Sequence, residues 1–228
     1  METILKNKKI LITAGPTREY LDPVRFISNE SSGKMGYAIA EALHEMGADV
    51  LLVSGPVCIT SSFPKHKIVS VVSASQMYEA CKTNFEHIDI AIFCAAVADY
   101  TPKITSDIKI KKIENEATVE LKKNIDIALE FGKVKRQDQK SIGFALETNN
   151  IRENAIGKLK KKNFDLVVIN SPTVNEGFGY DTNKITIVDK ELSVVNFPLK
   201  NKKDVAFDII ALLKESFKTI VVENNYMV

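Results

Sequence analysis

Hydrophobic and polar positions along the chain follow two alternating patterns. Short runs rich in β-branched residues predict buried strands, because continuous apolar runs of this length are typical of parallel sheets. These runs are Ile10–Thr13, Val50–Ser54, Ile68–Val72, Ile88–Cys94, Ile142–Ala145 and Leu166–Ile169. Apolar residues at helical spacing predict helices at Tyr37–Met46, Ser75–Phe85, Ile151–Lys162 and Lys202–Phe217. The alternation predicts an α/β fold with a Rossmann-like, doubly wound, mostly parallel sheet and helices on both faces.

Two parts of the chain depart from this alternation. Residues 100–123 are rich in lysine, glutamate, threonine and serine, so we expect a mobile flap at about 100–117 that leads to a short strand at Thr118–Leu121. Lys184–Val188 and Ser193–Phe197 flank a short polar turn, which predicts a small β-hairpin. The length suits one α/β unit, so residues 1–228 are expected to form a single domain.

Composition narrows the class of protein. A formal net charge of +2 argues against a dedicated nucleic-acid-binding protein. We expect no membrane association, because the chain has no apolar run of about 18 residues and its first residues lack the apolar segment of a signal peptide. Three cysteines without a paired framework or metal-ligand spacing predict a reduced, cytoplasmic protein.

The stretch from Thr13 to Gly36 connects the first strand to the first helix as a long loop. It ends in Ser31–Gly36, where hydroxyls and backbone N–H groups at a helix N-terminus favour a phosphate. Neither standard nucleotide motif matches, because Ser28 replaces the first glycine of a P-loop and Ser31 replaces that of GxGxxG. Lys34 is expected to face solvent. The glycine pattern alone leaves a phosphate-binding turn and an ordinary Gly/Ser loop open.

The complete stretch AGPTREYLDPVRFISNESSGKMG closely resembles the phosphopantothenate–cysteine ligases, or phosphopantothenoylcysteine synthetases, of coenzyme A biosynthesis. The resemblance continues in the family's order through FCAAVADY (Phe93–Tyr100), KIKK (Lys109–Lys112), GFALET (Gly143–Thr148) and the segment with Lys158 and Lys162. It covers nearly the whole chain. No part resembles the flavin-dependent decarboxylase that precedes the ligase in many bacterial proteins, so we expect a stand-alone ligase of bacterial type.

The resemblance implies a two-step reaction. A nucleoside triphosphate, with Mg²⁺ or Mn²⁺, activates the carboxylate of 4′-phosphopantothenate as an acyl-nucleotide, and the amine of L-cysteine then displaces the nucleotide. The version VRFISNESSGKMG is similar to the bacterial type, which implies CTP, and hence an acyl-CMP, over ATP. The implied partners are the three substrates, a second copy of the chain in a homodimer and a separate phosphopantothenoylcysteine decarboxylase. The metal ligands and the cysteine pocket are left open.

The resemblance also implies roles for individual residues. Asn29 would hold the acyl-nucleotide and Lys109 would act from a closing flap, so both are expected to be catalytic. Arg25 would reach the substrate phosphate of the neighbouring subunit. Substrate binding is implied for Arg25, Asn29, Ala95, Ala96 and Asp99. Nucleotide binding is implied for Gly15, Ser31, Gly33, Gly36, Cys94, Ala95, Asp99, Lys109, Ile125, Asp126, Ile127, Ala128, Phe144, Lys158, Lys162 and Asn170.

Each of these side chains suits its role and also has a structural explanation. The amide of Asn29 can both donate and accept hydrogen bonds, but Asn is also common in turns with left-handed backbone. The guanidinium of Arg25 suits a phosphate, but it could pair within the chain with Asp22 or Glu19. Lys109 could stabilise developing charge, although a run such as KIKK is more often a solvated loop face.

Two further functions share the predicted fold. An NAD(P)-dependent oxidoreductase is disfavoured by the incomplete GxGxxG and by Ser54-Gly55, which stand where a ribose-binding carboxylate is expected. A non-catalytic nucleotide-binding module would not need Asn29, Asp99 and Lys109 together. The chain also departs from the ligase pattern at Ile125, where a proline is usual, and at Ser171, where an aspartate is common.

Overall fold

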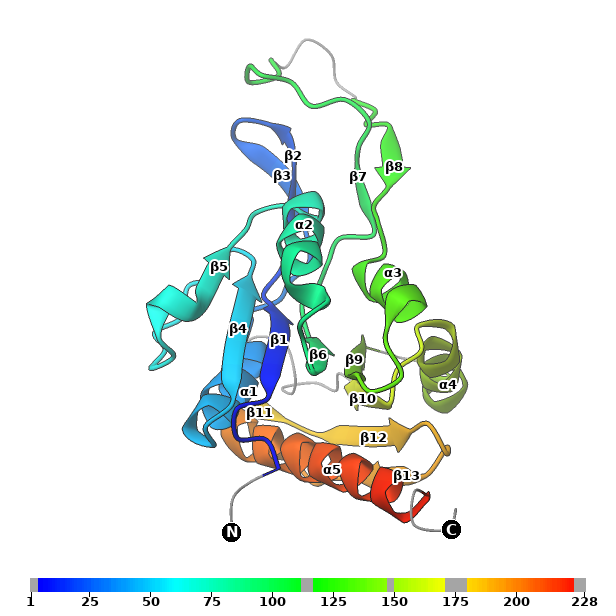
Figure 1. Ribbon diagram of the computed structural model, residues 1–228. Coiled ribbons are helices and arrows are strands. Elements are labelled where there is room, and N and C mark those ends of the chain that lie inside the picture. Colours follow the sequence, from blue (N-terminus) through cyan, green and yellow to red (C-terminus); the bar gives the residue numbers. More distant parts are fainter. Residues whose placement is uncertain (1–3, 112–116, 147–149, 171–179, 224–228) are drawn as a thin grey trace.

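The computed structural model describes residues 4–111, 117–146, 150–170 and 180–223 (Figure 1). An eight-stranded sheet forms its centre, with the strand order β13-β12-β10-β9-β6-β1-β4-β5. The parallel strands are β1 (Lys9–Ala14), β4 (Asp49–Ser54), β5 (Ile68–Ser70), β6 (Ile90–Phe93), β9 (Lys140–Leu146) and β10 (Leu166–Asn170). The predicted hairpin, β12 (Ile185–Asp189) and β13 (Val194–Asn196), adds an antiparallel edge. The doubly wound, mostly parallel sheet is therefore confirmed.

The order of the parallel strands reverses at β1. From β1 the chain continues to β4 and β5 on one side, and then crosses to β6, β9 and β10 on the other side. The connections that follow β1 and β6 therefore leave the sheet in opposite directions and open a crevice at the carboxyl ends of these strands. Gly15 and the segment Cys94–Asp99 follow these two ends, and a parallel bridge between Pro16 and Ala96 joins them.

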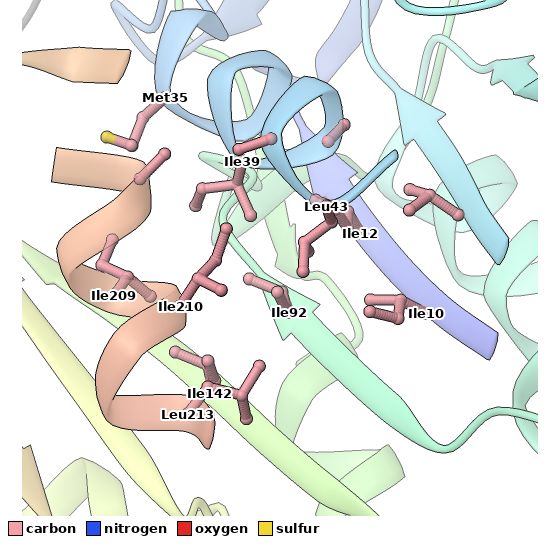
Figure 2. Close-up of a cluster of buried hydrophobic side chains, with 14 of the residues drawn as sticks. Ile10, Ile12, Met35, Ile39, Leu43, Ile92, Ile142, Ile209, Ile210 and Leu213 are labelled. Carbon is pink, nitrogen blue, oxygen red and sulfur yellow. The ribbon is translucent and has the colours of Figure 1, made fainter. Parts of the chain in front are cut away.

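Helices cover both faces of the sheet. The helices α1 (Lys34–Glu45) and α5 (Lys202–Glu223) pack on one face, and α2 (Ala74–Phe85), α3 (Ile127–Val134) and α4 (Ile151–Lys161) pack on the other. Side chains alternate along β1, so Ile10 and Ile12 join the first cluster while Leu11 joins the second. Figure 2 shows the first cluster, in which strand residues meet Ile39 and Leu43 of α1 and Ile209, Ile210 and Leu213 of α5.

The Thr13–Gly36 stretch is not one long loop, and this corrects the prediction. It contains an antiparallel hairpin of β2 (Arg18–Asp22) and β3 (Arg25–Ser28). The carboxylate of Asp22 accepts hydrogen bonds from the backbone N–H groups of Val24 and Arg25, both at 2.9 Å, and so closes the turn. The two strands are short and partly charged, so their pairing left little periodic signal in the sequence.

Residues 100–111 and 117–123 form an appendage next to the β2–β3 hairpin, in the upper part of Figure 1. The strand β7 (Tyr100–Pro102) pairs antiparallel with β8 (Leu121–Lys123), which begins where the predicted strand Thr118–Leu121 ends. Beyond β7 the chain bonds to the neighbouring hairpin, because the N–H of Ser106 donates to the carbonyl of Leu21 at 3.0 Å. The flap is thus attached to β2.

Other bounds differ modestly from the prediction. The helix α1 begins at Lys34 instead of Tyr37, and β5 ends at Ser70 instead of Val72. The helix α3 was not predicted, and it begins where the side chain of Asp126 accepts from the N–H of Leu129 at 3.1 Å. The remaining short elements are η1 (Lys65–Lys67), β11 (Thr182–Asn183) and β14 (Lys200–Asn201). A search of the described helices finds none long and apolar enough to cross a membrane.

Candidate active site

Two adjoining cavities open at the carboxyl ends of the parallel strands. The large cavity has a volume of about 410 Å³ and is lined by the N-terminus of α1, the segment after β6, the ends of β9 and β10 and the start of α5. The small cavity, of about 160 Å³, lies between the segment after β6, the start of α3 and the end of α4. Both cavities are lined by Ala95, Val97, Asp99, Phe144 and Lys158. A ligand that contacts these shared residues can extend into both.

The N-terminus of α1 supplies a phosphate-binding type of surface to the large cavity. Gly33 adopts a left-handed conformation, with φ +78°, and its N–H donates to the hydroxyl of Ser31 at 3.3 Å. Gly36 lets α1 approach β1 closely, since a Cβ at this position would lie 2.6 Å from the Cβ of Ala14. Gly15, a predicted nucleotide-binding residue, lines neither cavity. It lies against Gly33 instead, since a Cβ on Gly33 would be 3.2 Å from the Cα of Gly15. The helix therefore presents its first backbone N–H groups at the crevice.

Asn29 lies in the wall of the large cavity. Its amide nitrogen donates to the carbonyl oxygens of Ala96 and Val97, at 3.2 and 3.1 Å, and so ties the end of β3 to the segment after β6. Asn29 is not among the described residues with positive φ, so a left-handed turn does not explain its presence. The structure thus brings Asn29 and Ala96, both predicted substrate-binding residues, into contact.

The small cavity gathers most of the remaining predicted nucleotide-binding residues. Asp126 caps α3, and its carboxylate accepts from the ammonium of Lys162 at 2.9 Å. Lys158 lies one helical turn before Lys162 and lines both cavities, whereas Lys162 lines only the small one of the two. Phe144 is half-buried and lines both cavities, which a purely core phenylalanine would not do. Three further predicted nucleotide-binding residues that line the small cavity are Ile125, Ile127 and Ala128.

The large cavity brings together Lys34 and Lys202, which lie far apart in the sequence. Lys34 lines the cavity and donates to the carboxylate of Asp181 at 2.6 Å, so it is not simply a solvent-facing residue. Lys202, the first residue of α5, is buried; burial lowers its pKa, and the charge of Lys34 lowers it further. Burial raises the pKa of Cys94 to about 12, so this thiol is neutral at the cavity wall. Asn170 lines the same cavity.

Arg25 and Lys109 lie outside both cavities. The guanidinium of Arg25 binds the buried carboxylate of Asp22 and also donates to the carbonyl of Ile110 at 2.8 Å. This hydrogen bond from Arg25 holds the pKa of Asp22 well below its usual range. The pair with Asp22 is the alternative that the sequence left open, and a contact of Arg25 with the substrate phosphate of a second subunit stays a prediction. Lys109 is exposed on the flap.

Three remaining points concern metal ligands, the end of β4 and the predicted residues that the structure does not describe. Among the described residues, no three histidine, cysteine, aspartate or glutamate side chains gather as a metal-binding group. At the end of β4, the hydroxyl of Ser54 accepts from Tyr37 at 3.0 Å and donates to the Gly55 carbonyl, so this position serves packing. The residues Lys112, Glu147, Thr148 and 171–179 lie outside the part of the chain that the structure describes.

Comparison with known proteins identifies the family of this chain. The family model of the DNA/pantothenate metabolism flavoprotein C-terminal domain matches residues 5–217. The chain belongs to this family. Among the curated relatives of this DNA/pantothenate metabolism family member, the bifunctional coenzyme A biosynthesis protein CoaBC of Bacillus subtilis is 46% identical over 207 residues, which cover 90% of this chain and 51% of that protein. A protein named cysteine/cysteine sulfinic acid decarboxylase, from an unknown prokaryotic organism, is 50% identical over 92% of this chain and 58% of its own length.

The chain therefore spans about half the length of the curated relatives it matches. Among solved structures, the C-terminal domain of a CoaBC protein superposes with a TM-score of 0.79 at 41% identity, covering 94% of this chain and 98% of that domain. A Cab2 mutant in complex with phosphopantothenate-cysteine superposes with a TM-score of 0.74 at 16% identity, covering 95% and 89%. At such low identity the Cab2 likeness confirms the fold alone.

Proposed function

We propose that this chain is a phosphopantothenate–cysteine ligase, which joins 4′-phosphopantothenate to L-cysteine in coenzyme A biosynthesis. The observation that carries the proposal is the large cavity, where the N-terminus of α1 and the wall formed by Asn29 and Ala96 face the same space. A phosphate-binding helix end next to an amide-lined wall suits a reaction between a carboxylate and a phosphoanhydride. The family match and the name of the CoaBC relatives support the assignment.

The two cavities would hold different parts of the reactants. The nucleoside would lie in the small cavity against Phe144 and the Asp126–Lys162 pair, and its phosphates would extend into the large cavity toward Ser31 and Gly33. The carboxylate of 4′-phosphopantothenate would lie at the Asn29 wall. This arrangement holds the carboxylate oxygen near the α-phosphorus, and such positioning converts a bimolecular reaction into a local one.

The chemistry then proceeds in two displacements. The carboxylate oxygen forms a bond to the α-phosphorus, the bond to the bridging oxygen of the β-phosphate breaks, and pyrophosphate leaves with the electron pair. The amine of cysteine next forms the amide bond at the acyl carbon, the nucleoside monophosphate leaves, and the amine proton is lost to solvent. In both steps Asn29 would donate a hydrogen bond to an oxygen that gains negative charge. Its amide nitrogen donates to the carbonyls of Ala96 and Val97 in this structure, so one of these hydrogen bonds would have to break first.

Lys109 and the flap belong to the same proposal. Lys109 lies outside the cavities while the flap is bonded to the β2–β3 hairpin, through Ser106 to Leu21 and through Ile110 to Asp22. For Lys109 to reach the acyl-nucleotide, these hydrogen bonds must break and the flap must move over the large cavity. Closure of this kind would exclude water from an intermediate that is prone to hydrolysis.

Several finer features are also part of the proposal. Mg²⁺ usually binds one or two carboxylates together with substrate phosphates, and Asp99 fits this role because it lines both cavities, whereas Asp126 is engaged by Lys162. When bound, the ion would neutralise phosphate charge. CTP over ATP, a homodimer, a separate decarboxylase partner and a cytoplasmic location rest on the resemblance and the unpaired cysteines.

The decisive experiment measures pyrophosphate in both half-reactions. Purified protein is incubated with Mg²⁺, 4′-phosphopantothenate and either CTP or ATP, with and without L-cysteine. We expect pyrophosphate release that depends on phosphopantothenate, and amide product only when cysteine is added. No release with either nucleotide, from folded protein, would refute the proposal. A thermal shift by NADPH and not by CTP or ATP would instead favour an oxidoreductase.

A matched pair of variants tests the role of Asn29. Asn29→Ala should lower pyrophosphate release by about 100-fold, which is typical for loss of one donor to a developing oxyanion. Asn84→Ala is the control, because the amide of Asn84 also donates to a backbone carbonyl, that of Ala80 at 3.0 Å, but lies on α2 away from both cavities. Equal rates for the two variants would show that Asn29 only joins two segments.

A further inference from the structure

Four residues that the resemblance does not assign meet at one end of the large cavity, which we call the lysine end. Lys34 comes from α1, Asp181 and Asn183 from the segment at β11, and Lys202 from the start of α5. Lys34 donates to the Asp181 carboxylate at 2.6 Å, and Lys202 donates to the carbonyl of Tyr180. Lys34, Asn183 and Lys202 line the large cavity, and none of the four lines the small cavity.

The charges at the lysine end suit a ligand with more than one negative charge. Lys34 is close enough for its charge to lower the pKa of Lys202, which is only 8% exposed. Two neighbouring ammonium groups repel each other in a buried setting unless anions lie beside them. Asp181 supplies one carboxylate, but its side chain is 84% exposed and therefore screened by solvent. Among the residues that the structure describes, the lysine end therefore carries two ammonium groups against one exposed carboxylate and is net positive.

Asn183 provides an independent observation. It is 2% exposed, and its Oδ1 is the buried side-chain atom without a hydrogen-bond partner among the residues that the structure describes. Leaving a buried polar atom unpaired is unfavourable, so proteins rarely retain one without a reason. Because Asn183 lines the large cavity and an amide oxygen accepts hydrogen bonds, an N–H or O–H group of a bound molecule is the simplest partner for this Oδ1.

We propose that Lys34 and Lys202 bind the β- and γ-phosphates of the nucleoside triphosphate, the two groups that leave as pyrophosphate. The inference rests on the proposed ligase function. With the nucleoside in the small cavity and the α-phosphate at the Asn29 wall, the lysine end is the remaining part of the large cavity. Two cations there would stabilise the negative charge that the leaving group gains as the bond between the α-phosphorus and the bridging oxygen breaks.

The test compares charge-removing variants with a matched lysine. Lys34→Gln removes one cation from a half-exposed position, and Lys202→Met removes the other while filling its buried volume. Lys202→Arg retains the charge and serves as a second variant in case the methionine variant does not fold. Lys203→Gln is the control, because Lys203 is adjacent on α5, exposed and outside both cavities.

We would measure, without cysteine, the KM for the triphosphate, the KM for phosphopantothenate and the inhibition constant of added pyrophosphate. Calorimetry would give the Kd of the nucleoside monophosphate and of pyrophosphate alone. Loss of one charged hydrogen bond predicts about 10- to 100-fold weaker binding of triphosphate and pyrophosphate for Lys34→Gln and Lys202→Met. The monophosphate should bind within about twofold of the wild type, Lys202→Arg should retain more affinity for pyrophosphate than Lys202→Met, and Lys203→Gln should stay near wild type.

Three results would overturn the proposal. Unchanged pyrophosphate inhibition in both charge-removing variants would show that the lysines do not touch the leaving group. Equal weakening of the monophosphate would place the nucleoside there instead. A rise confined to the KM for phosphopantothenate would assign the lysine end to the phosphate of that substrate. A wild-type protein without any pyrophosphate release would refute the ligase function itself, and the direct binding of pyrophosphate would still test the lysine end.

Discussion

The contact between Gly36 and Ala14 makes the placement of α1 testable by adding one methyl group. In Gly36→Ala the new Cβ would lie 2.6 Å from the Cβ of Ala14 and 3.2 Å from its Cα, whereas ordinary contacts begin at 3.4 Å. The helix must therefore withdraw from β1 by about 0.8 Å, since Ala14 is itself fully buried in a central strand and cannot move easily. The withdrawal displaces the backbone N–H groups at the large cavity.

The expected effect on function is larger than the effect on stability. Overpacking a core costs about 1–3 kcal/mol, but replacing a helical glycine by alanine returns about 1 kcal/mol, so the free energy of unfolding should fall by about 0–2 kcal/mol. Misplacing a binding group by about 1 Å can reduce a rate by about 100-fold. We therefore expect kcat/KM for the nucleoside triphosphate to fall by about 10- to 100-fold, measured by pyrophosphate release on folded protein.

Two control variants separate the displacement of α1 from the general effect of adding a methyl group to a helix. Gly157→Ala places the same methyl group on α4 where nothing lies within 4 Å, so it should raise stability by up to about 1 kcal/mol and leave the kinetics unchanged. Ala14→Gly combined with Gly36→Ala removes the clashing Cβ and should recover part of the activity. Wild-type kinetics in Gly36→Ala, with stability raised as in Gly157→Ala, would refute the reasoning.

Three further predictions concern the flap, the hairpin and a cavity thiol. Lys109→Gln should lower product formation by at least about 100-fold with an unchanged melting temperature; near-normal turnover would contradict the flap role. Arg25→Ala mixed with Lys109→Gln should regain part of the activity if Arg25 acts across a dimer, and no recovery in verified mixed dimers would place its action within one chain. At pH 8 iodoacetamide should label the exposed Cys58 well before Cys94, whose pKa is about 12 and whose thiol is therefore almost entirely protonated; equal labelling by mass spectrometry would contradict the raised pKa of Cys94.

Local patterns were sufficient for much of the fold. The continuous apolar runs at β1, β4, β6, β9 and β10 predicted central strands because strands buried on both faces need apolar residues at every position. The hairpin β2–β3 and the helix α3 were missed. Both are short and depend on one side chain each, Asp22 for the turn and Asp126 for the cap, so their periodic signal was weak.

The candidate site was also predictable only in part from local patterns. The sequence predicted that Ser31–Gly36 follows a buried strand and precedes a helix. Such a helix N-terminus after a parallel strand is determined by neighbours in the chain. The grouping of Lys34 with Lys202 was not readable, because nothing in either local sequence indicates that α5 returns to the N-terminus of α1. Likewise, the choice of Arg25 for Asp22 over Glu19 depends on the geometry of the turn.

The sequence by itself thus determined the family resemblance, the doubly wound sheet and the Gly/Ser-rich turn before α1, because these depend on residue type, spacing and alternation along the chain. Only the tertiary structure decided which side chains share a cavity, which carboxylate neutralises which cation and where the flap is attached. These depend on contacts between residues far apart in sequence, such as Asp22 with Ile110, and the free energy of such contacts leaves no local pattern.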